Sequence, residues 1–276
     1  MIWRFNGKNN HKTKKYGLCS TKRKPLIFRP TFHIQNRCAT FKKNLKMNRI
    51  GLIEGIGPES TIECYRLIIK KFQEKLNTKD HPELLILSVN MEEMIGYAFN
   101  NKIEELIDFL SRRIFMLEKS EVDYIALASN TPHIVFDDLA NRTKMISIVE
   151  ETCKAIKNKQ IKKIALFGTK STMNHGFYQL VAKKYGIEII TPSKEKQNYI
   201  HDKYINELVQ NKIIPKTKKD FIDIARELRK ENGIEGLILG GTELCLTLSQ
   251  SDFKTLTIFD TTEIHVESIV NAMIKK

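Results

Sequence analysis

The sequence predicts an α/β protein made of two similar three-layer α/β domains, each with a parallel-rich sheet. Two observations support this prediction. Short apolar runs of strand length alternate with stretches of helical apolar spacing along most of the chain. Two of these runs, residues 124–128 and 236–239, end in small and polar residues just before a helical pattern begins. Because ligands bind at the carboxyl ends of strands in open α/β sheets, we expect a ligand cleft between the two domains.

The first 46 residues differ in composition from the rest of the chain. They contain 13 of the 46 Lys and Arg residues and none of the 32 Asp and Glu residues, which leaves 33 basic against 32 acidic residues after them. The net charge of +14 is therefore concentrated in this basic leader, and no nucleic-acid partner is expected for the body. The leader lacks apolar periodicity, so we expect residues 1–46 to lie outside the fold, with Met47 as a candidate start. An organellar targeting segment and a nucleic-acid-binding arm are the alternatives.

Membrane insertion and metal binding are not indicated by the sequence. No run approaches the ~18 apolar residues of a membrane span, so we expect a cytoplasmic protein, or an imported one if the leader is a targeting segment. The five cysteines, at 19, 38, 64, 153 and 245, show neither metal-ligand spacing nor a disulfide framework. We find no metal or nucleotide motif and therefore expect no cofactor.

The first domain is expected to begin at residue 47 and to run to 144. Its first strand and helix are joined by a glycine turn, where glycine lets the backbone approach an anion and the helix dipole favours a carboxylate. The connections between its strands are long enough for parallel crossovers. The expected strands are 49–53, 84–89 and 124–128, and the expected helices are 62–76, 91–99, 103–118 and 133–140.

The second domain is expected to comprise residues 145–254 and to repeat this alternation. Gly186 follows one of its helices, as glycine commonly does at a helix carboxyl end. The expected strands are 145–149, 163–167, 187–190 and 236–239, and the expected helices are 150–158, 177–185, 195–208 and 218–231. A last strand at 255–259 and a closing helix at 263–275 follow.

The two polar strand ends carry motifs that resemble those of the aspartate/glutamate racemase family, and of aspartate racemases in particular. That family has Cys-Asn-Thr-(Ala or Pro)-His at the first strand end and Gly-Cys-Thr-Glu at the second. The corresponding segments here are Ser129-Asn130-Thr131-Pro132-His133 and Gly240-Gly241-Thr242-Glu243. Aspartate racemases also have Gly-Gly-Met-Gly-Pro where this chain has Glu54-Gly55-Ile56-Gly57-Pro58. Ser129 and Gly241 thus stand at both catalytic cysteine positions of the family.

The resemblance covers about residues 48–276 and has wider implications. It implies that residues 255–276 return to the first domain and that the protein is a homodimer. It also implies a cofactor-independent racemase that interconverts the L and D forms of aspartate, glutamate or a relative, so the expected partner is a small amino acid or dicarboxylate. No nucleic-acid or membrane partner is expected.

Racemisation without a cofactor needs an acid/base group on each side of the α-carbon. Ser129 matches the first thiol in size, but its hydroxyl is a far weaker base, so it is either an acid/base residue or a hydrogen-bonding residue. Gly241 has no side chain, and Glu54 and Cys245 are therefore the other catalytic candidates. A structural carboxylate and a buried structural thiol are the respective alternatives.

The remaining site candidates are expected to bind the substrate. Aspartate racemases have an arginine after the second strand and a lysine in the helix after the fourth, but here residues 88–94 contain no arginine and Leu180 stands at the lysine position. Lys170 is the candidate that would compensate. The full set is Gly55, Gly57, Thr61, Asn130, Thr131, His133, Thr169, Lys170, Gly241, Thr242 and Glu243.

Three functions fit these residues. The first is an amino-acid racemase of the aspartate/glutamate type. The second is a lyase, isomerase or decarboxylase of the same superfamily with chemistry on one face only. The third is a catalytically inactive homologue that binds an amino acid or carboxylate in the cleft.

Overall fold

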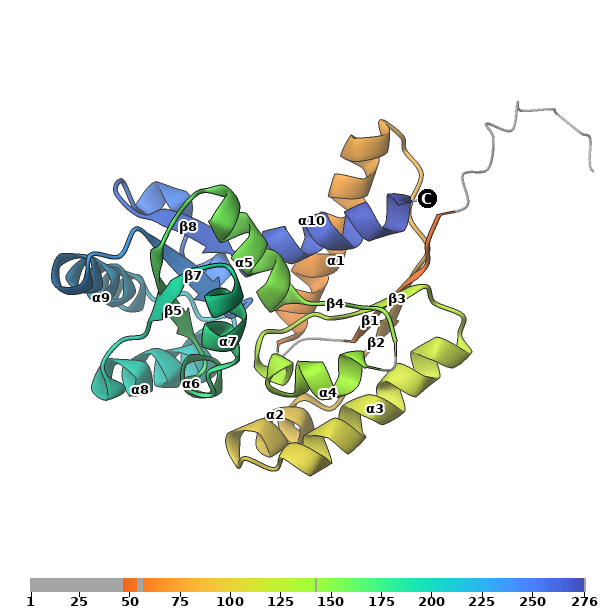
Figure 1. Ribbon diagram of the computed structural model, residues 1–276, viewed down its shortest axis with the longest axis horizontal. Helices are drawn as coiled ribbons and strands as arrows, with labels where there is room; N and C mark the ends of the chain where they lie inside the picture. Colours follow the sequence, from red (N-terminus) through yellow and green to blue (C-terminus); the bar gives the residue numbers. More distant parts are fainter. Residues whose placement is uncertain (1–46, 54–56, 142, 276) are drawn as a thin grey trace, which may run out of the picture. The chain divides into compact units, whose positions relative to one another are not determined.

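The computed structural model describes residues 47–53, 57–141 and 143–275. Within these residues, strands form two four-stranded sheets with the orders β2-β1-β3-β4 and β6-β5-β7-β8 (Figure 1). Every strand pair is parallel. The predicted α/β class with two parallel sheets is therefore confirmed. The basic leader lies outside the described residues, as do Glu54 and Gly55 of the glycine turn.

The first sheet has helices on both faces because its central strands are apolar on both sides. Ile50 and Leu52 of β1 pack with α1 and α10, whereas Ile53 packs with α2 and α3, as the period of two in a strand requires. The strands are β1 (Ile50–Ile53), β2 (Leu84–Leu87), β3 (Tyr124–Leu127) and β4 (Met145–Ile146). The helices are α1 (Pro58–Leu76), α2 (Met91–Phe99), α3 (Ile103–Lys119), the 3-10 turn η1 (Thr131–Val135), α4 (Phe136–Ala140) and α10 (Thr261–Ile274).

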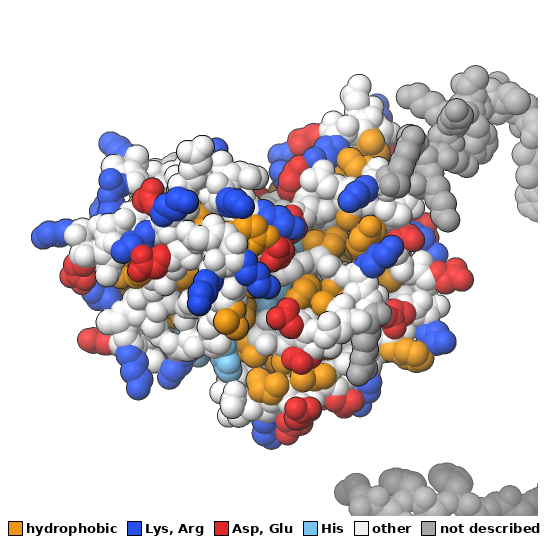
Figure 2. Space-filling view, in the orientation of Figure 1, with side chains coloured by type: hydrophobic (Ala, Val, Ile, Leu, Met, Phe, Trp, Pro, Cys, Tyr) orange, Lys and Arg blue, Asp and Glu red, His pale blue; other side chains and the backbone are white. Residues whose placement is uncertain are grey.

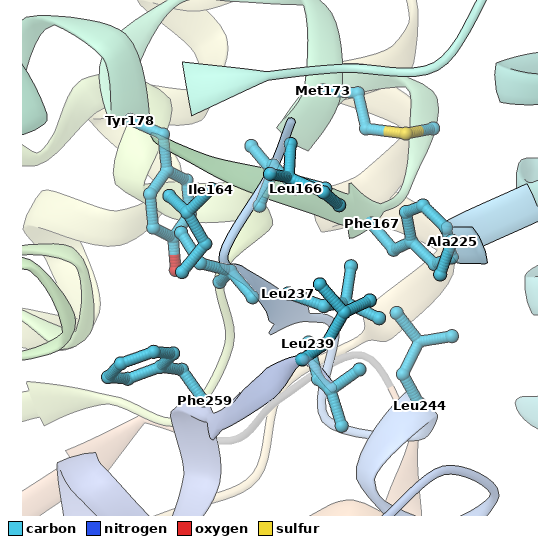
Figure 3. Packing of buried hydrophobic residues seen from close by; sticks show 14 of the residues in the cluster. Ile164, Leu166, Phe167, Met173, Tyr178, Ala225, Leu237, Leu239, Leu244 and Phe259 are labelled. Carbon is cyan, nitrogen blue, oxygen red and sulfur yellow. The ribbon is translucent and has the colours of Figure 1, made fainter. Parts of the chain in front are cut away.

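The second sheet lies in the largest hydrophobic cluster of the described chain. Leu166, Phe167, Leu237 and Leu239 of its two central strands are fully buried there (Figure 3). The strands are β5 (Lys163–Gly168), β6 (Glu188–Ile190), β7 (Gly236–Gly240) and β8 (Thr257–Asp260). The helices are α5 (Ile148–Asn158), α6 (Lys170–Asn174), α7 (Phe177–Lys184), α8 (Lys194–Lys203) and α9 (Pro215–Asn232), with a π-helical turn η2 (Tyr204–Leu208) and 3-10 turns η3 (Leu244–Leu246) and η4 (Gln250–Asp252).

Two strands lie in a different sheet from the one expected. β4 pairs with β3 of the first sheet, although residue 145 was expected to open the second domain, and β8 pairs with β7 of the second sheet, although residues 255–276 were expected to return to the first. In both cases the chain crosses over after the strand. The crossover comes at the helix caps, where Ser147 accepts from the Glu150 N–H and Asp260 accepts from the N–H groups of Thr262 and Glu263. Only α10 returns, packing against α1.

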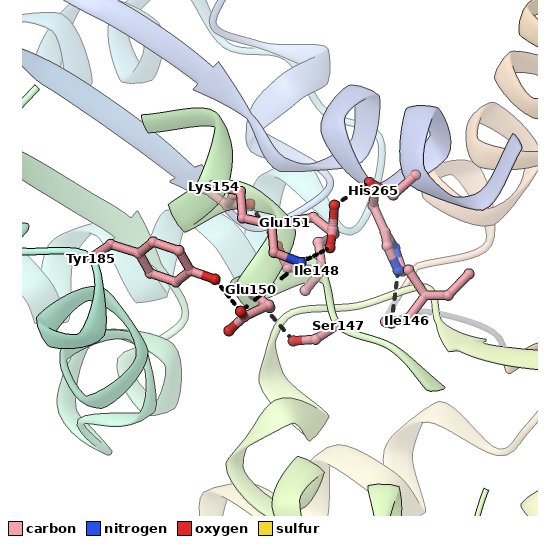
Figure 4. Close-up of polar contacts among 10 residues, drawn as sticks. Ile146, Ser147, Ile148, Glu150, Glu151, Lys154, Tyr185 and His265 are labelled. Atoms are coloured by element: carbon pink, nitrogen blue, oxygen red, sulfur yellow. Dashed lines mark hydrogen bonds and ion pairs between the residues drawn. The ribbon is translucent and has the colours of Figure 1, made fainter. Parts of the chain in front are cut away.

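Polar contacts fasten α5 and α10 beside β4 (Figure 4). Nε2 of His265 lies 3.1 Å from the Ile146 carbonyl oxygen, and the Ser268 hydroxyl donates to Glu151 at 2.7 Å. Burial lowers the pKa of His265 to about 4, so its neutral ring donates from Nε2 to that carbonyl. Tyr185, the residue that caps the carboxyl end of α7, donates to Glu150 of α5. The crossover between the sheets is thus held by specific bonds as well as by apolar packing.

Acidic and basic side chains of the described residues lie side by side over the face shown in Figure 2. Among the described residues, no helix is long and apolar enough to span a membrane.

Candidate active site

The carboxyl ends of the two central strands in each sheet meet at one buried polar cluster. The loop after β3 contacts the start of α6 after β5, and the loop after β7 contacts Gly57 after β1. The expected arrangement of strand ends around one site is therefore present in the described residues. The cluster contains hydroxyls, one amide and one carboxylate, and the buried polar residues of the described chain include no Lys or Arg.

Histidine 133 holds the first motif loop in place. Its Nδ1 lies 2.9 Å from the carbonyl oxygen of Ser129, and its Nε2 accepts the backbone N–H of Ile148 at 3.2 Å. The accepting Nε2 assigns the proton to Nδ1, and burial lowers the pKa of the ring to about 3. The ring also stacks on Phe136 with centroids 4.9 Å apart. Both ring nitrogens are thus committed to backbone groups, so His133 orients the loop and does not deprotonate the Ser129 hydroxyl.

Asparagine 130 joins the first motif loop to the second sheet. Its Nδ2 donates to the hydroxyl of Thr261 at 3.1 Å, and its Oδ1 accepts from the hydroxyl of Tyr178 at 2.5 Å. The Thr261 hydroxyl in turn donates to the carbonyl of Leu239, at the end of β7, at 2.7 Å. Asn130 therefore sets the distance between the ends of β3 and β7.

Three threonine hydroxyls join the loop after β3 to the start of α6, which follows β5. Thr131 Oγ1 lies 3.1 Å from that of Thr169 and 3.3 Å from that of Thr172, and the last two are 3.0 Å apart. Thr169 also caps α6 by accepting the N–H of Thr172. All three side chains are buried. These bonds hold the loop after β3 against the start of α6.

Serine 129 occupies the first cysteine position of the motif. It is 2% exposed, and within the described chain its hydroxyl has no hydrogen-bond partner, because the bond to His133 uses its carbonyl. A hydroxyl without a partner in the described chain is available to a ligand. Its position supports both of the roles that the sequence leaves open.

Glycine 241 stands where the resemblance predicts the second cysteine, and Tyr204 fills the space beside it. A β-carbon at residue 241 would collide with the tyrosine ring and lie 2.9 Å from its hydroxyl oxygen. Tyr204 is 1% exposed and begins the π-helical turn η2. Sequence reasoning missed this residue, because Tyr204 lies inside a stretch whose apolar spacing predicts an ordinary helix.

Glutamate 243 lies between this tyrosine and the amino-terminal end of α1. Its Oε2 accepts from the hydroxyls of Tyr204 and Thr242, whereas its buried Oε1 has no partner among the described residues. Oε1 lies where a side chain at Gly57 would project, which explains the glycine at the start of α1. The positive end of the α1 dipole favours a carboxylate there.

The remaining candidates are spread over the margins of this cluster. Cys245 lines a cavity of about 380 Å³ together with Thr242 and Asp260, and burial and the Asp260 carboxylate raise the pKa of its thiol well above the usual value. Lys170 is exposed beside a second cavity of about 300 Å³, where its backbone N–H donates to His201.

Thr61 is buried in the first turn of α1, close enough to donate to the Gly57 carbonyl at 3.5 Å. Glu54 and Gly55 lie outside the described residues. Within the described chain, no group of three His, Cys, Asp or Glu residues is arranged to hold a metal ion.

A family model and several known proteins are similar to this chain. The sequence profile of the family described as Asp/Glu/Hydantoin racemase matches residues 53–269. The broad specificity amino-acid racemase RacX of Bacillus subtilis (strain 168) is 32% identical over 146 residues, which span 51% of this chain and 63% of RacX.

Two solved structures are similar over most of the chain. An aspartate racemase homologue from Pyrococcus horikoshii OT3 is 33% identical with a TM-score of 0.71, covering 82% of this chain and 98% of that one. A candidate Asp/Glu racemase from Yersinia pestis is 28% identical with a TM-score of 0.75, covering 83% of this chain and 100% of that one.

Proposed function

The chain belongs to the Asp/Glu/hydantoin racemase family, and from that premise we propose that it is an amino-acid racemase. In this proposal it interconverts the L and D forms of a small amino acid by removing the α-proton and returning a proton to the other face. The chemistry uses side chains of the chain alone and no cofactor. The relatives named above as racemases support the reaction class.

The observation that carries the proposal is the convergence of four strand ends on a buried cluster with two unengaged oxygens. One is the Ser129 hydroxyl after β3, and the other is Glu243 Oε1 after β7. An acid/base site needs groups that are dry, positioned and free to bond a reacting atom. The threonine hydroxyls and the backbone N–H groups of the same loops suit an α-carboxylate.

The proposal also concerns the side chain of the substrate. We propose aspartate, glutamate or a relative, because the motifs resemble those of aspartate racemases. The buried cluster offers no cation for a second carboxylate, and Lys170 at the rim is the nearest candidate that the sequence suggests. Neutral amino acids therefore belong in the substrate panel beside the acidic ones.

A catalytically inactive carboxylate-binding homologue is the second candidate. It is favoured by one observation, namely that a tyrosine ring fills the space beside Gly241 where the family has a cysteine. Such a protein would bind an amino acid between the loops and release it unchanged. Binding and turnover must therefore be measured together.

The test is α-proton exchange in D2O, followed by NMR, with chiral chromatography of the same samples. The full chain is mixed with L- and D-aspartate, L- and D-glutamate and a panel of neutral amino acids. We expect loss of the α-proton signal and of optical purity with at least one substrate, and loss of inversion in Ser129→Ala. Binding by thermal shift without exchange or inversion would instead identify the inactive homologue.

The oligomeric state and the cellular location are a separate part of the proposal. We propose a homodimer in the cytoplasm, on the resemblance to the racemase family. Size-exclusion chromatography with light scattering measures the first, and a monomer at all accessible concentrations would contradict it.

A further inference from the structure

We propose that the Tyr204 hydroxyl, paired with the Glu243 carboxylate, is the acid/base group on the substrate face where the family has its second cysteine. This inference rests on the proposed racemase function and identifies a catalytic residue for it. It starts from the space beside Gly241. A β-carbon there would lie 2.9 Å from the Tyr204 hydroxyl oxygen, so this oxygen occupies the region that a short side chain at position 241 would reach.

The local backbone explains how a helix residue reaches this position. The backbone N–H of Val209 bonds the carbonyl of Tyr204 at 3.0 Å, five residues earlier, so the turn after α8 is π-helical. Glu207 secures the turn, because its carboxylate accepts from Lys203 at 2.7 Å and from Thr217 at 2.5 Å. Isolated π-helical turns occur frequently at functional sites. The ion pair and hydrogen bond thus hold Tyr204 in an uncommon backbone that places its ring against Gly241.

Glutamate 243 gives the tyrosine an acceptor for its proton. The carboxylate is 1% exposed, and its described donors are neutral hydroxyls, with no ion pair to Lys or Arg. Its Oε2 already accepts the phenolic hydrogen bond, so a proton released by the phenol has an acceptor in place. Burial and the adjacent Glu243 also raise the pKa of Tyr204 well above its usual value. The phenol therefore stays protonated at rest and reacts only together with the glutamate.

The proton transfer balances without another reactant. The α-carbon–hydrogen bond of the substrate breaks, and its proton passes to the phenolic oxygen. The original phenolic proton passes at the same time to Oε2 of Glu243, and the negative charge of the carboxylate ends on the α-carbon. The reverse movement returns a proton to the same face.

The opposite face has weaker chemistry. Ser129 is the candidate acid/base group on that face, and a hydroxyl gives up its proton far less readily than a thiol. Exchange of the α-proton on the Tyr204 face should therefore be faster than inversion. The enantiomer that presents its α-proton to Tyr204 should take up deuterium from D2O before it loses optical purity, whereas the other enantiomer should not.

The test measures exchange and inversion by the full chain and three variants, at saturating substrate. Tyr204→Phe keeps the ring beside Gly241 but removes the hydroxyl, and Glu243→Gln keeps the shape of the side chain but removes the basic carboxylate. Each is expected to slow exchange about 100-fold or more with substrate binding retained by thermal shift. Tyr199→Phe is the matched control, because Tyr199 also lies on the α8 segment but donates to a different carboxylate. Its hydroxyl bonds Asp220 at 2.5 Å. The exchange rate of Tyr199→Phe should stay within about twofold of the parent rate, a change far smaller than the roughly 100-fold loss expected of an acid/base residue.

A second substitution reports the phenol directly. Incorporation of 3-fluorotyrosine at position 204 lowers the pKa of the phenol, so the pH–rate profile of exchange should move to lower pH. A ring that only fills space would leave the profile unchanged. Exchange by Tyr204→Phe at the parent rate would overturn this inference and leave the racemase proposal standing. A parent protein that exchanges and inverts no amino acid would overturn both.

Discussion

The two motif loops follow the central strands β3 and β7 but differ at the positions where the family resemblance predicts a cysteine. The loop after β3 keeps a short side chain, Ser129, whose backbone is fastened by His133 and whose hydroxyl is unengaged. The loop after β7 has no side chain at Gly241, and a tyrosine from another element fills the space. A motif position that loses its side chain thus has to be interpreted together with the residue that occupies the space.

Restoring the second cysteine alone should produce the largest effect. In Gly241→Cys the new side chain collides with the Tyr204 ring, and overpacking of this kind costs about 3 kcal/mol of the free energy of unfolding. Tyr204→Ala removes the collision, so the double variant Gly241→Cys/Tyr204→Ala should be destabilised by less than the sum of the two single variants, as measured by urea unfolding. Equal stability of the single variant and the parent would show that the tyrosine ring moves aside freely and does not fix the space beside Gly241.

Acid should destabilise the first loop more than the second. His133 has a folded-state pKa of about 3 because its buried ring resists charging, whereas in the unfolded chain it binds a proton below about 6.5. Its contribution to stability is therefore complete above pH 6.5 and is lost as the pH falls toward 3, with roughly 2 kcal/mol gone between pH 7 and 5. His265 adds a similar loss toward pH 4.

Urea unfolding at several pH values measures this effect. The variant His133→Gln should roughly halve the loss of stability between pH 7 and 5, because the buried His265 still contributes, whereas substitution of the exposed His175 by Gln should leave it as in the parent. A parental slope in His133→Gln would mean that the buried ring is not the titrating group.

Restoring the first cysteine should sharpen the functional contrast. Ser129→Cys is nearly isosteric, and because a thiol is the better acid and base we expect inversion to rise about tenfold while exchange on the Tyr204 face stays unchanged. Chiral chromatography and NMR on the same samples separate the two rates. A slower inversion in Ser129→Cys would show that Ser129 only hydrogen-bonds the substrate.

The threonine contact between the loops should have the smallest effect. Thr131→Val removes one hydroxyl, while Thr169 and Thr172 still bond each other. We expect a loss of about 1 kcal/mol in the free energy of unfolding, typical of one buried hydrogen bond. Thermal denaturation measures it, and Thr255→Val at an exposed position is the control.

Much of the fold was predictable because local patterns carry it. The apolar runs predicted all eight strands of the described chain to within a few residues. The polar residues after residues 127 and 240 predicted the two motif loops. The assignment of β4 and β8 to the other sheet was not predictable, because a two-residue and a four-residue strand carry no record of their partners. The functional roles of Glu54 and Gly55 stay predictions, since both lie outside the described residues.

The alternation of strands and helices and the positions of the two motif loops could be predicted from the sequence alone, and the replacement of both family cysteines stays a prediction from the resemblance. These follow from residue type and spacing, which are local properties. Only the tertiary structure decided that Tyr204 fills the space beside Gly241 and bonds Glu243. That contact depends on a π-helical turn and on how the α8 segment packs against β7, and no periodicity in the sequence encodes the distance between side chains of two separate elements.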